Sequence, residues 1–296
     1  MRKYLLTLAA VACLTSHAQI AQVNSTEPLL RGVEKEMYYP VLSQDGTKLL
    51  FTSSNCQGLK MYDFNDDVTI KISEAERAGL EASFSADGKN VYFISQVQKG
   101  GKNVRQAKKF DLGSKQEVAI SSEGRLVARP IAVKGGVITS VDGKVNSTVK
   151  ANIAVRVQGT SLYITKNGVE KAYTPIERSA GYLWASLSPD ESKVMFFAAG
   201  KGIVITDLNG AIVAELGNYE CPVWYGNNHV VAMNAKHNGY QNISSQILIM
   251  NVDGSEKQEL TKPESMTMNP TASFDAGKIV YNTIDGRLYQ MNISLK

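Results

Sequence analysis

The sequence predicts an all-β fold, a six-bladed β-propeller with four-stranded blades. Three observations favour it: one strand–turn–strand motif recurs six times, a hairpin follows most copies, and helical periodicity is nearly absent. Four short strands in a unit of about 40–45 residues is the usual pattern of a propeller blade. A β-sandwich is the competing fold, but Greek-key sandwiches do not repeat one four-stranded unit.

The first repeated element is a Ser-x-Asp-Gly turn between two apolar runs. It stands in residues 42–51 (LSQDGTKLLF) and 84–93 (FSADGKNVYF). Glycine accepts a positive φ and the aspartate side chain caps the local backbone, so this pair of residues suits a tight turn. A third copy lies at residues 187–196, a shortened copy at 273–281, and two degenerate copies at 130–139 and 222–232.

The spacing of the copies supports tandem blades. The apolar residues that precede each turn are 42, 48, 55, 37 and 48 residues apart, and they are Leu42, Phe84, Ala132, Leu187, Trp224 and Ala272. Hairpins follow at residues 60–72, 107–120, 161–173, 203–214 and 247–260. Three of their turns are Asn167-Gly168, Asn209-Gly210 and Asp253-Gly254, which is strong hairpin chemistry.

The last unit has only three expected strands before the chain stops. We expect residues 25–31 to supply its fourth, outermost strand, where Pro28 is tolerated because an edge strand needs hydrogen bonds on one side. Residues 19–296 then form one domain. Its blades are expected at about residues 37–73, 80–121, 127–176, 182–217, 220–261 and 268–296.

The N-terminus has the pattern of a signal peptide. Arg2 and Lys3 precede an apolar run at 4–14, and Ser16-His17-Ala18 supplies small residues at the cleavage positions. We expect residues 1–18 to be removed and the protein to be periplasmic or secreted. Cys13 offers a less favoured alternative, a lipidated cysteine. No apolar run reaches the roughly 18 residues that a membrane span needs.

Charge and cysteine content exclude several classes. The formal net charge is +4, too small to indicate nucleic-acid binding. Beyond the leader only Cys56 and Cys221 remain, in units one and five, which are not adjacent in a six-membered ring, so two free thiols are expected. We expect a monomer.

The turn motif also resembles a known family. The pattern Ser-x-Asp-Gly-Lys-x-Val/Leu-x-Phe at residues 43–51 and 85–93 is similar to the repeats of TolB-like propellers, which also occur beside dipeptidyl-peptidase and tricorn-type proteases. The resemblance covers about residues 37–296. It implies the fold and an envelope partner, but no site residue carries over. TolB has an α/β domain before its propeller and the peptidases a hydrolase domain, and neither is expected here.

Catalytic motifs are not found in the sequence. Gly-x-Ser-x-Gly does not occur, and His229 and His237 are the only histidines beyond the leader. Closely spaced Cys and His ligands for zinc are also missing, and the acidic stretch 63–67 is interpreted as a solvated turn. The carboxylates expected near the channel axis are Glu34, Glu36 and Glu220, and nothing selects a catalytic pair. We expect no enzyme, metal or cofactor.

Binding residues are expected at the mouth of the central channel. Aromatic and arginine side chains precede several inner strands, and a long loop of the same face adds two more side chains; such residues anchor binding surfaces. The candidates are Tyr38, Tyr39, Arg129, Arg178, Tyr182, Trp184, Tyr219, Glu220, His237 and Tyr240. The alternative for each aromatic residue is ordinary packing between blades.

Two functions from different classes follow. The first is non-catalytic binding of an envelope-associated protein by the loop-rich face of the ring. The second is a glycan-binding or glycan-active propeller with its site at the channel mouth. The order of residues 142–159 stays open, because this stretch can instead add a hairpin through 152–157.

Overall fold

The computed structural model describes residues 19–30, 36–148 and 153–296. The predicted leader with Cys13, and also Glu34, lie outside these ranges. No helix in the described ranges is long and apolar enough to cross a membrane. The described part is built from strands, with one short 3₁₀ turn, η1 (Pro263–Ser265).

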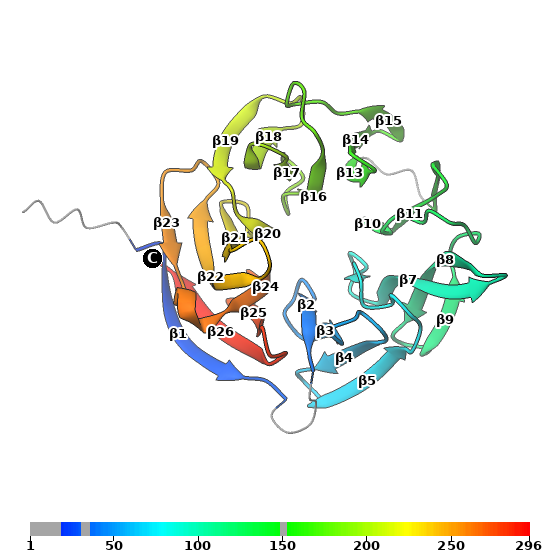
Figure 1. The fold of residues 1–296 in the computed structure, drawn as a ribbon, viewed down its shortest axis with the longest axis horizontal. Coiled ribbons are helices and arrows are strands. Elements are labelled where there is room, and N and C mark those ends of the chain that lie inside the picture. Colours follow the sequence, from blue (N-terminus) through cyan, green and yellow to red (C-terminus); the bar gives the residue numbers. More distant parts are fainter. Residues whose placement is uncertain (1–18, 31–35, 149–152) are drawn as a thin grey trace, which may run out of the picture.

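Seven antiparallel sheets surround a central channel (Figure 1). The predicted all-β propeller fold is confirmed, but the prediction of six blades is wrong. Five sheets have four strands and two have three. The error lies in the expected blade 127–176, which forms two separate sheets.

Four of the four-stranded sheets follow the order of the chain from the channel outwards. The first has β2 (Tyr38–Leu42), β3 (Lys48–Thr52), β4 (Leu59–Asp63) and β5 (Val68–Ser73). The second has β6 (Ser83–Phe84), β7 (Asn90–Lys99), β8 (Lys102–Asp111) and β9 (Gln116–Ala119). The next has β16 (Tyr182–Leu187), β17 (Lys193–Ala198), β18 (Gly202–Asp207) and β19 (Ile212–Gly217). The fourth has β20 (Glu220–Tyr225), β21 (His229–His237), β22 (Asn242–Asn251) and β23 (Lys257–Glu259).

The last sheet joins the two ends of the described chain. Its order is β1 (Ala21–Pro28), β26 (Leu288–Leu295), β25 (Lys278–Thr283) and β24 (Thr267–Ser273). Strand β1 pairs antiparallel with β26. The sequence placed this outer strand at residues 25–31, a few residues too late.

Two three-stranded sheets occupy the space of one expected blade. They are β10 (Ile131–Val133), β11 (Gly136–Val141) and β12 (Lys144–Ser147), then β13 (Ile153–Gln158), β14 (Ser161–Lys166) and β15 (Val169–Ala172). The extra strand β13 has four β-favouring or small apolar residues in IAVRVQ and a Gly159-Thr160 turn. This turn lacks the Ser-x-Asp-Gly pattern, so counting that motif missed the sheet.

Strand β13 also runs against the direction of its neighbour. A Cβ on Gly181, one residue before β16 begins, would lie 3.5 Å from Thr160, just after β13 ends. The two inner strands are therefore antiparallel. By contrast, the Leu42 amide near the end of β2 donates to Thr271 Oγ1 towards the end of β24 at 3.0 Å, so those inner strands are parallel.

The repeated turns have one geometry. The Ser43, Ser85 and Ser188 hydroxyls each donate to the aspartate two residues on at 2.6 Å. Each serine oxygen also accepts a backbone N–H five residues on at 2.9 Å. The serines are buried, so the pattern in the sequence reflects a buried hydroxyl that ties both strands of the turn together.

The apolar core is unevenly distributed around the ring. The cluster between the β20–β23 and β24–β26 sheets has eleven buried residues, among them Ile249 and Ile279. Each of the two clusters beside the β10–β12 sheet contains three: Ile94, Ala107 and Val127 on one side, and Val133, Ile138 and Ala154 on the other. We call inner strands β16, β20, β24 and β2 the packed arc, and β6, β10 and β13 the open arc.

Candidate binding site in the central channel

The inner strands of the packed arc share a bulge that faces the channel. The strand pairing shifts register near Tyr39, Trp184, Cys221 and Asn269. All four residues have a φ between 50° and 52°, the left-handed region that side chains disfavour. Such conformations persist where the surroundings impose them, and they often occur at functional sites.

In the open arc, charged residues occupy the position that corresponds to Tyr39 and Trp184. Glu81 and Arg129 precede Ala82 and Pro130, as Tyr39 precedes Pro40. The strands that follow are short, two residues in β6 and three in β10. The inner wall therefore recedes, and a cavity of about 980 Å³ opens along this side of the channel.

The cavity is lined by both apolar and charged side chains. Phe84, Leu126, Ile131, Leu183 and Trp184 contribute the apolar surface. The Trp184 ring is 36% exposed and packs edge-on against Phe197 with ring centroids 5.5 Å apart. The charged side chains that line the cavity are Glu81, Arg105, Arg129, Lys134, Arg156 and Glu191.

Arg105 and Arg129 are two arginines of the cavity lining that the same carboxylate, Glu81, acts on. Arg105 donates from Nε to Gln96 Oε1 at 2.9 Å, and burial and the nearby Arg77 charge lower its pKa while Glu81 raises it. Arg129 is exposed to solvent within the channel, yet the surrounding protein desolvates its charge and lowers its pKa, again opposed by Glu81. Glu81 is thus the carboxylate that acts on both guanidinium groups.

Arg156 is neutralised within its own sheet. Its Nε and Nη2 donate to the two Glu170 oxygens at 2.7 and 2.5 Å, and Nη1 donates to Gln158 at 2.6 Å. The guanidinium carbon lies 4.6 Å from the Tyr163 ring centroid. Arg156 donates hydrogen bonds from all three of its guanidinium nitrogens. It therefore joins β13 to β15 and is a structural part of the cavity wall.

The structure brings Arg129 and Trp184 of the sequence-predicted residues into this cavity. Tyr38 and Tyr39 lie instead at the packed arc, with ring centroids 6.3 Å apart. The Tyr38 hydroxyl donates to the Ile284 carbonyl at 3.1 Å. Tyr39 is 40% exposed, and burial first, then Cys56, Cys221 and Tyr38, raises its pKa.

Three other predicted residues lie away from the cavity. Tyr182 is buried, donates to the Ile176 carbonyl at 3.1 Å and packs on Phe196, so it belongs to the core. Tyr219 packs beside the Lys257 ammonium, which donates to its hydroxyl at 3.1 Å. Arg178 is exposed in the segment that precedes β16.

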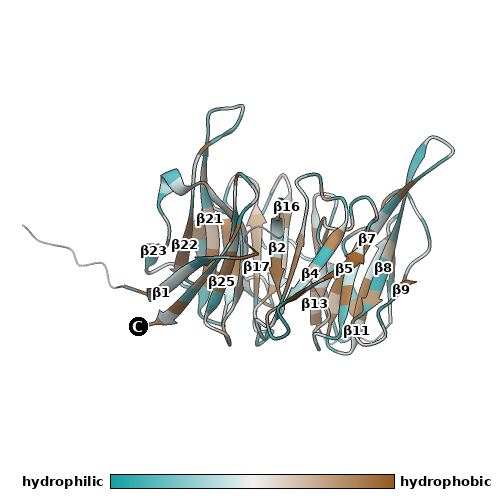
Figure 2. Ribbon diagram, turned by 90° about the horizontal axis from the view of Figure 1, so that it is seen from below, coloured by the Kyte–Doolittle hydropathy of each residue, from teal (hydrophilic) through white to brown (hydrophobic). Residues whose placement is uncertain are grey.

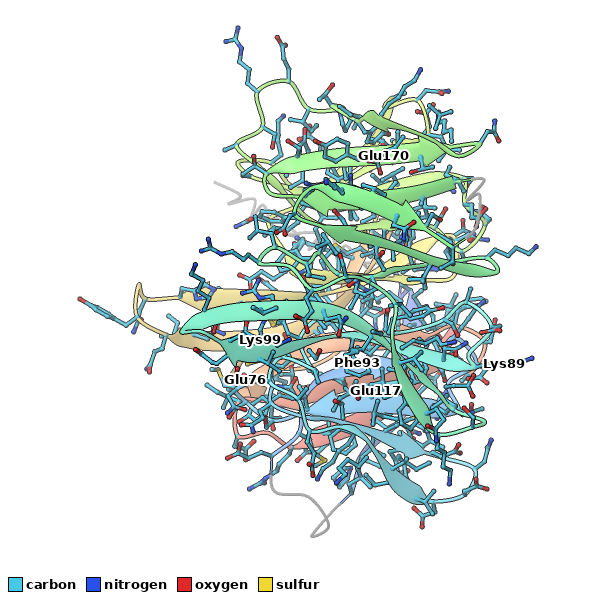
Figure 3. The ribbon with its side chains drawn as sticks, turned by 90° about the vertical axis from the view of Figure 1, so that its right-hand side faces the viewer. Glu76, Lys89, Phe93, Lys99, Glu117 and Glu170 are labelled. Carbon is cyan, nitrogen blue, oxygen red and sulfur yellow. The ribbon has the colours of Figure 1, made fainter. Side chains whose placement is uncertain are left out.

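Two long hairpins rise from one face of the ring (Figure 2). Strands β7 and β8 form one, with ten residues each, and β21 and β22 form the other, with nine and ten. In the side view of Figure 3, Lys99 lies towards the hairpin end of β7 and Lys89 towards the opposite face of the ring. Tyr240, at the tip of the second hairpin, is 98% exposed.

The remaining predicted pair lies where the β21–β22 hairpin leaves the ring. His237 Nε2 is 3.2 Å from Glu220 Oε1, and the two side chains are 52% and 35% exposed. The described residues contain no group of three or more His, Cys, Asp or Glu side chains that could hold a metal ion. Cys56 and Cys221 are free thiols, and burial followed by the Glu220 charge raises the pKa of Cys221 to about 12.

Sequence reasoning missed Glu81 and Arg105, which both line the cavity. Glu81 had a usable signal, because aligning the repeats places it with Tyr39, Arg129 and Trp184, one residue before Pro or Ala. Arg105 had none: it lies on the second hairpin strand and reaches the cavity only because the inner strand β6 is short.

The ring of sheets defines this chain as a β-propeller, and solved structures with a similar fold specify it further. TolB from Acinetobacter baumannii matches with a TM-score of 0.55 and 18% identity, over 80% of this chain and 57% of that one. A putative TolB from Agrobacterium tumefaciens matches with a TM-score of 0.53 and 14% identity, over 88% and 91%. The predicted resemblance to TolB-like propellers is confirmed at the level of the fold.

Other propellers are similar as well. Oligogalacturonate lyase in complex with manganese matches with a TM-score of 0.51 and 12% identity, over 88% of this chain and 78% of that one. The tricorn protease matches with a TM-score of 0.54 and 16% identity, and this chain spans 26% of its length. No protein-family model matches the sequence, and no curated protein matches it either.

Proposed function

We propose that the protein is a non-catalytic, exported binding protein that holds a protein partner against the hairpin-bearing face of the ring. The observation that carries this function is the pair of hairpins, β7–β8 and β21–β22, which project from the same face on two sides of the channel (Figure 2). Each strand is several residues longer than the roughly 5–6 residues typical of strands.

The hairpins carry exposed apolar side chains. Val97 is 45% exposed, Ile243 56% and Tyr240 98%. Ordered hairpins that present such residues to solvent are suited to contact a partner, and aromatic side chains are the common anchors of protein interfaces. A rigid ring also presents its loops in fixed positions, so little ordering entropy is lost when a partner binds.

Quantitative capture from an envelope extract tests the function. The double variant Tyr240→Ser, Ile243→Ser should lose at least 90% of a partner that the unaltered protein retains in equimolar amount, because both apolar anchors are gone, on the order of 1–2 kcal/mol each. Ile212→Ser is the matched control, since Ile212 is 48% exposed on the outer strand β19. Equal retention by all three proteins would contradict a role for the hairpins.

Export is tested separately. The signal-peptide pattern supports cleavage after Ala18, and mass spectrometry of the protein recovered from the periplasmic fraction should find Gln19 at the N-terminus. Recovery of the intact chain from the cytosol would contradict export. A mass increase on a new N-terminal Cys13 would favour the lipidated form.

A glycan-active propeller remains the second candidate because Glu220 and His237 form a carboxylate–imidazole pair at 3.2 Å on the channel side of the β21–β22 hairpin. Oligogalacturonate lyase, a protein of the same fold, is named for an acidic glycan. If the chain acts on a glycan through this pair, Glu220→Gln should abolish turnover of an oligosaccharide panel. No turnover by the unaltered protein would contradict this candidate.

A further inference from the structure

Three arginines near the open arc form no ion pair with any residue that the structure describes. None of the ion pairs found in the described residues includes Arg77, Arg105 or Arg129. Arg77 Nε is buried and has no hydrogen-bond partner. Its charge reaches Arg105, and Glu81 is the carboxylate that acts on Arg105 and Arg129. Arg77 does not line the cavity, but Arg105, Arg129 and Lys134 do, without an ion pair among the described residues. The carboxylates of the lining are Glu81 and Glu191, so positive charge is in excess there.

Buried or enclosed cations without partners are costly, and the cost is removed when an anion binds. A guanidinium offers a planar fork of donors that matches the two oxygens of a carboxylate. Towards the described residues, Arg105 donates a side-chain hydrogen bond from its Nε alone, so its terminal nitrogens are available to a ligand. The part of the cavity that Arg105 and Arg129 line therefore suits a carboxylate ligand.

The apolar residues of the cavity wall indicate the chemistry of the rest of the ligand. Leu126, Ile131 and Leu183 are aliphatic, Phe84 is aromatic, and Trp184 presents its ring. Leu126 is 70% exposed and Leu183 51%, so this apolar surface is accessible. A sugar chain would need a dense set of hydrogen-bond partners, whereas leucine- or phenylalanine-like side chains would cover these residues.

We propose that the cavity of the open arc binds an acidic segment of a polypeptide, with one or more carboxylates between Arg105 and Arg129 and neighbouring apolar side chains on the Leu126, Leu183 and Trp184 wall. This inference rests on the proposed function, because it names the part of the protein partner that enters the channel. A cavity of about 980 Å³ lies at the upper end of the usual range for ligand sites, about 300–1,000 Å³.

Tryptophan fluorescence provides a readout local to this cavity. The chain has two tryptophans, so Trp224→Phe leaves Trp184 as the only tryptophan whose emission is followed. The probe is an unlabelled heptapeptide of alternating leucine and glutamate, and its counterpart has glutamine in place of glutamate. The acidic peptide should change Trp184 emission saturably and bind at least about tenfold more tightly than the glutamine peptide, because each charge-assisted hydrogen bond contributes to the difference.

Charge variants in the Trp224→Phe background test the assignment. Arg129→Gln should weaken the acidic peptide about tenfold, and Glu81→Gln should strengthen it, because the competing carboxylate is removed. Lys257→Gln removes one positive charge from the outer strand β23 and should leave binding unchanged. The opposite signs of the first two variants separate a local charge effect from loss of folding, which circular dichroism checks directly.

Several results would overturn this assignment. Equal affinity for the two peptides, no effect of Arg129→Gln, or saturable binding of oligogalacturonate instead of the acidic peptide would each do so. The double variant Tyr240→Ser, Ile243→Ser should bind the peptide normally. Loss of partner capture together with intact peptide binding therefore isolates a failure at the hairpins from a failure in the cavity.

Discussion

The packed arc and the open arc each contain the Ser–Asp turn, at Ser188 and at Ser85, but differ in what lies between their sheets. The Ser–Asp hydrogen bond is 2.6 Å long at Ser85 in the open arc and at Ser188 in the packed arc. Yet the cluster between the β20–β23 and β24–β26 sheets holds eleven buried apolar residues, whereas the two clusters beside the β10–β12 sheet of the open arc hold three each. The local geometry of a blade is thus independent of its packing against the next blade, and the ring can admit a cavity without changing its repeat.

The turn glycines show the same difference at one site. A Cβ on Gly46 would lie 2.5 Å from Ala276 Cβ, and one on Gly226 would lie 3.0 Å from the Phe274 ring. At the equivalent Gly88 and Gly135 no atom lies within 4 Å. Turns of the packed arc are therefore fitted against the neighbouring sheet, while those of the open arc project freely.

The largest difference in stability is expected when a buried isoleucine is replaced by alanine in each arc. Ile249→Ala in the packed arc should reduce the free energy of unfolding by about 4 kcal/mol, because Ile249 is fully buried within the eleven-residue cluster. Ile138→Ala beside the open arc should cost about 2 kcal/mol or less, because its cluster is small and adjoins the cavity. Urea unfolding followed by circular dichroism measures both values.

Equal losses at the two isoleucines would show that the arcs are energetically alike. Amide hydrogen exchange gives an independent check. The amides of β11 should exchange through openings of lower free energy than those of β21, because fewer apolar contacts hold the β10–β12 sheet to its neighbours.

A smaller effect is expected at the turn glycines. Gly46 and Gly88 have φ values of 67° and 68°, so alanine brings the same backbone strain to each. Only Gly46→Ala also forces a clash with Ala276, which should add about 1–2 kcal/mol of destabilisation. Thermal unfolding of the two variants gives the difference, and matching melting temperatures would show that the turns are equally free.

Of these changes, acidification should have the smallest effect on the free energy of unfolding through these turns. The effect should be alike in both arcs. The hydrogen bond from Ser85 lowers the pKa of Asp87, and that from Ser188 lowers the pKa of Asp190, below the ordinary value of 3.8. The folded protein then holds its protons more weakly than the unfolded chain. This contribution to stability is complete above about pH 4 and declines as the pH falls through the folded pKa values.

Carboxyl-carbon NMR titration of Asp87 and Asp190 tests that expectation. Both midpoints should fall below the ordinary value, and Ser85→Ala and Ser188→Ala should each raise the midpoint of the adjacent aspartate alone. A shift at only one of the two would show that the repeated turn differs between the arcs.

The sequence predicts most of the fold because each blade carries its turn chemistry locally. The Asp-Gly and Asn-Gly pairs dictate backbone conformations that only a few turns use, so hairpins could be placed without knowing their neighbours. The β13–β15 sheet was not counted as a separate blade, because its first turn, Gly159-Thr160, has no such signature. Its β14–β15 hairpin was predicted, and β13 corresponds to the alternative hairpin left open at residues 152–157. The number of sheets is a property of inter-sheet packing, which no local motif encodes.

The candidate site was less predictable for a related reason. Arg129 and Trp184 could be proposed because they precede inner strands, but Tyr182 has the same placement and is buried against Phe196. Whether a side chain faces the channel depends on a one-residue bulge, which reverses the alternation along the strand. Arg105 enters the site because β6 is two residues long, and strand length is the least certain part of any reading of a sequence.

The pairing of β1 with β26 sets the order of events during synthesis. Strand β1 is translated before the other described strands, yet its hydrogen-bonding partner, Leu288–Leu295, is translated after all the others. Until then the growing chain is an arc with two exposed sheet edges, the condition under which β-proteins associate wrongly. Shielding of that early strand until its partner β26 has been translated is therefore a requirement that this architecture imposes on any cell that makes it.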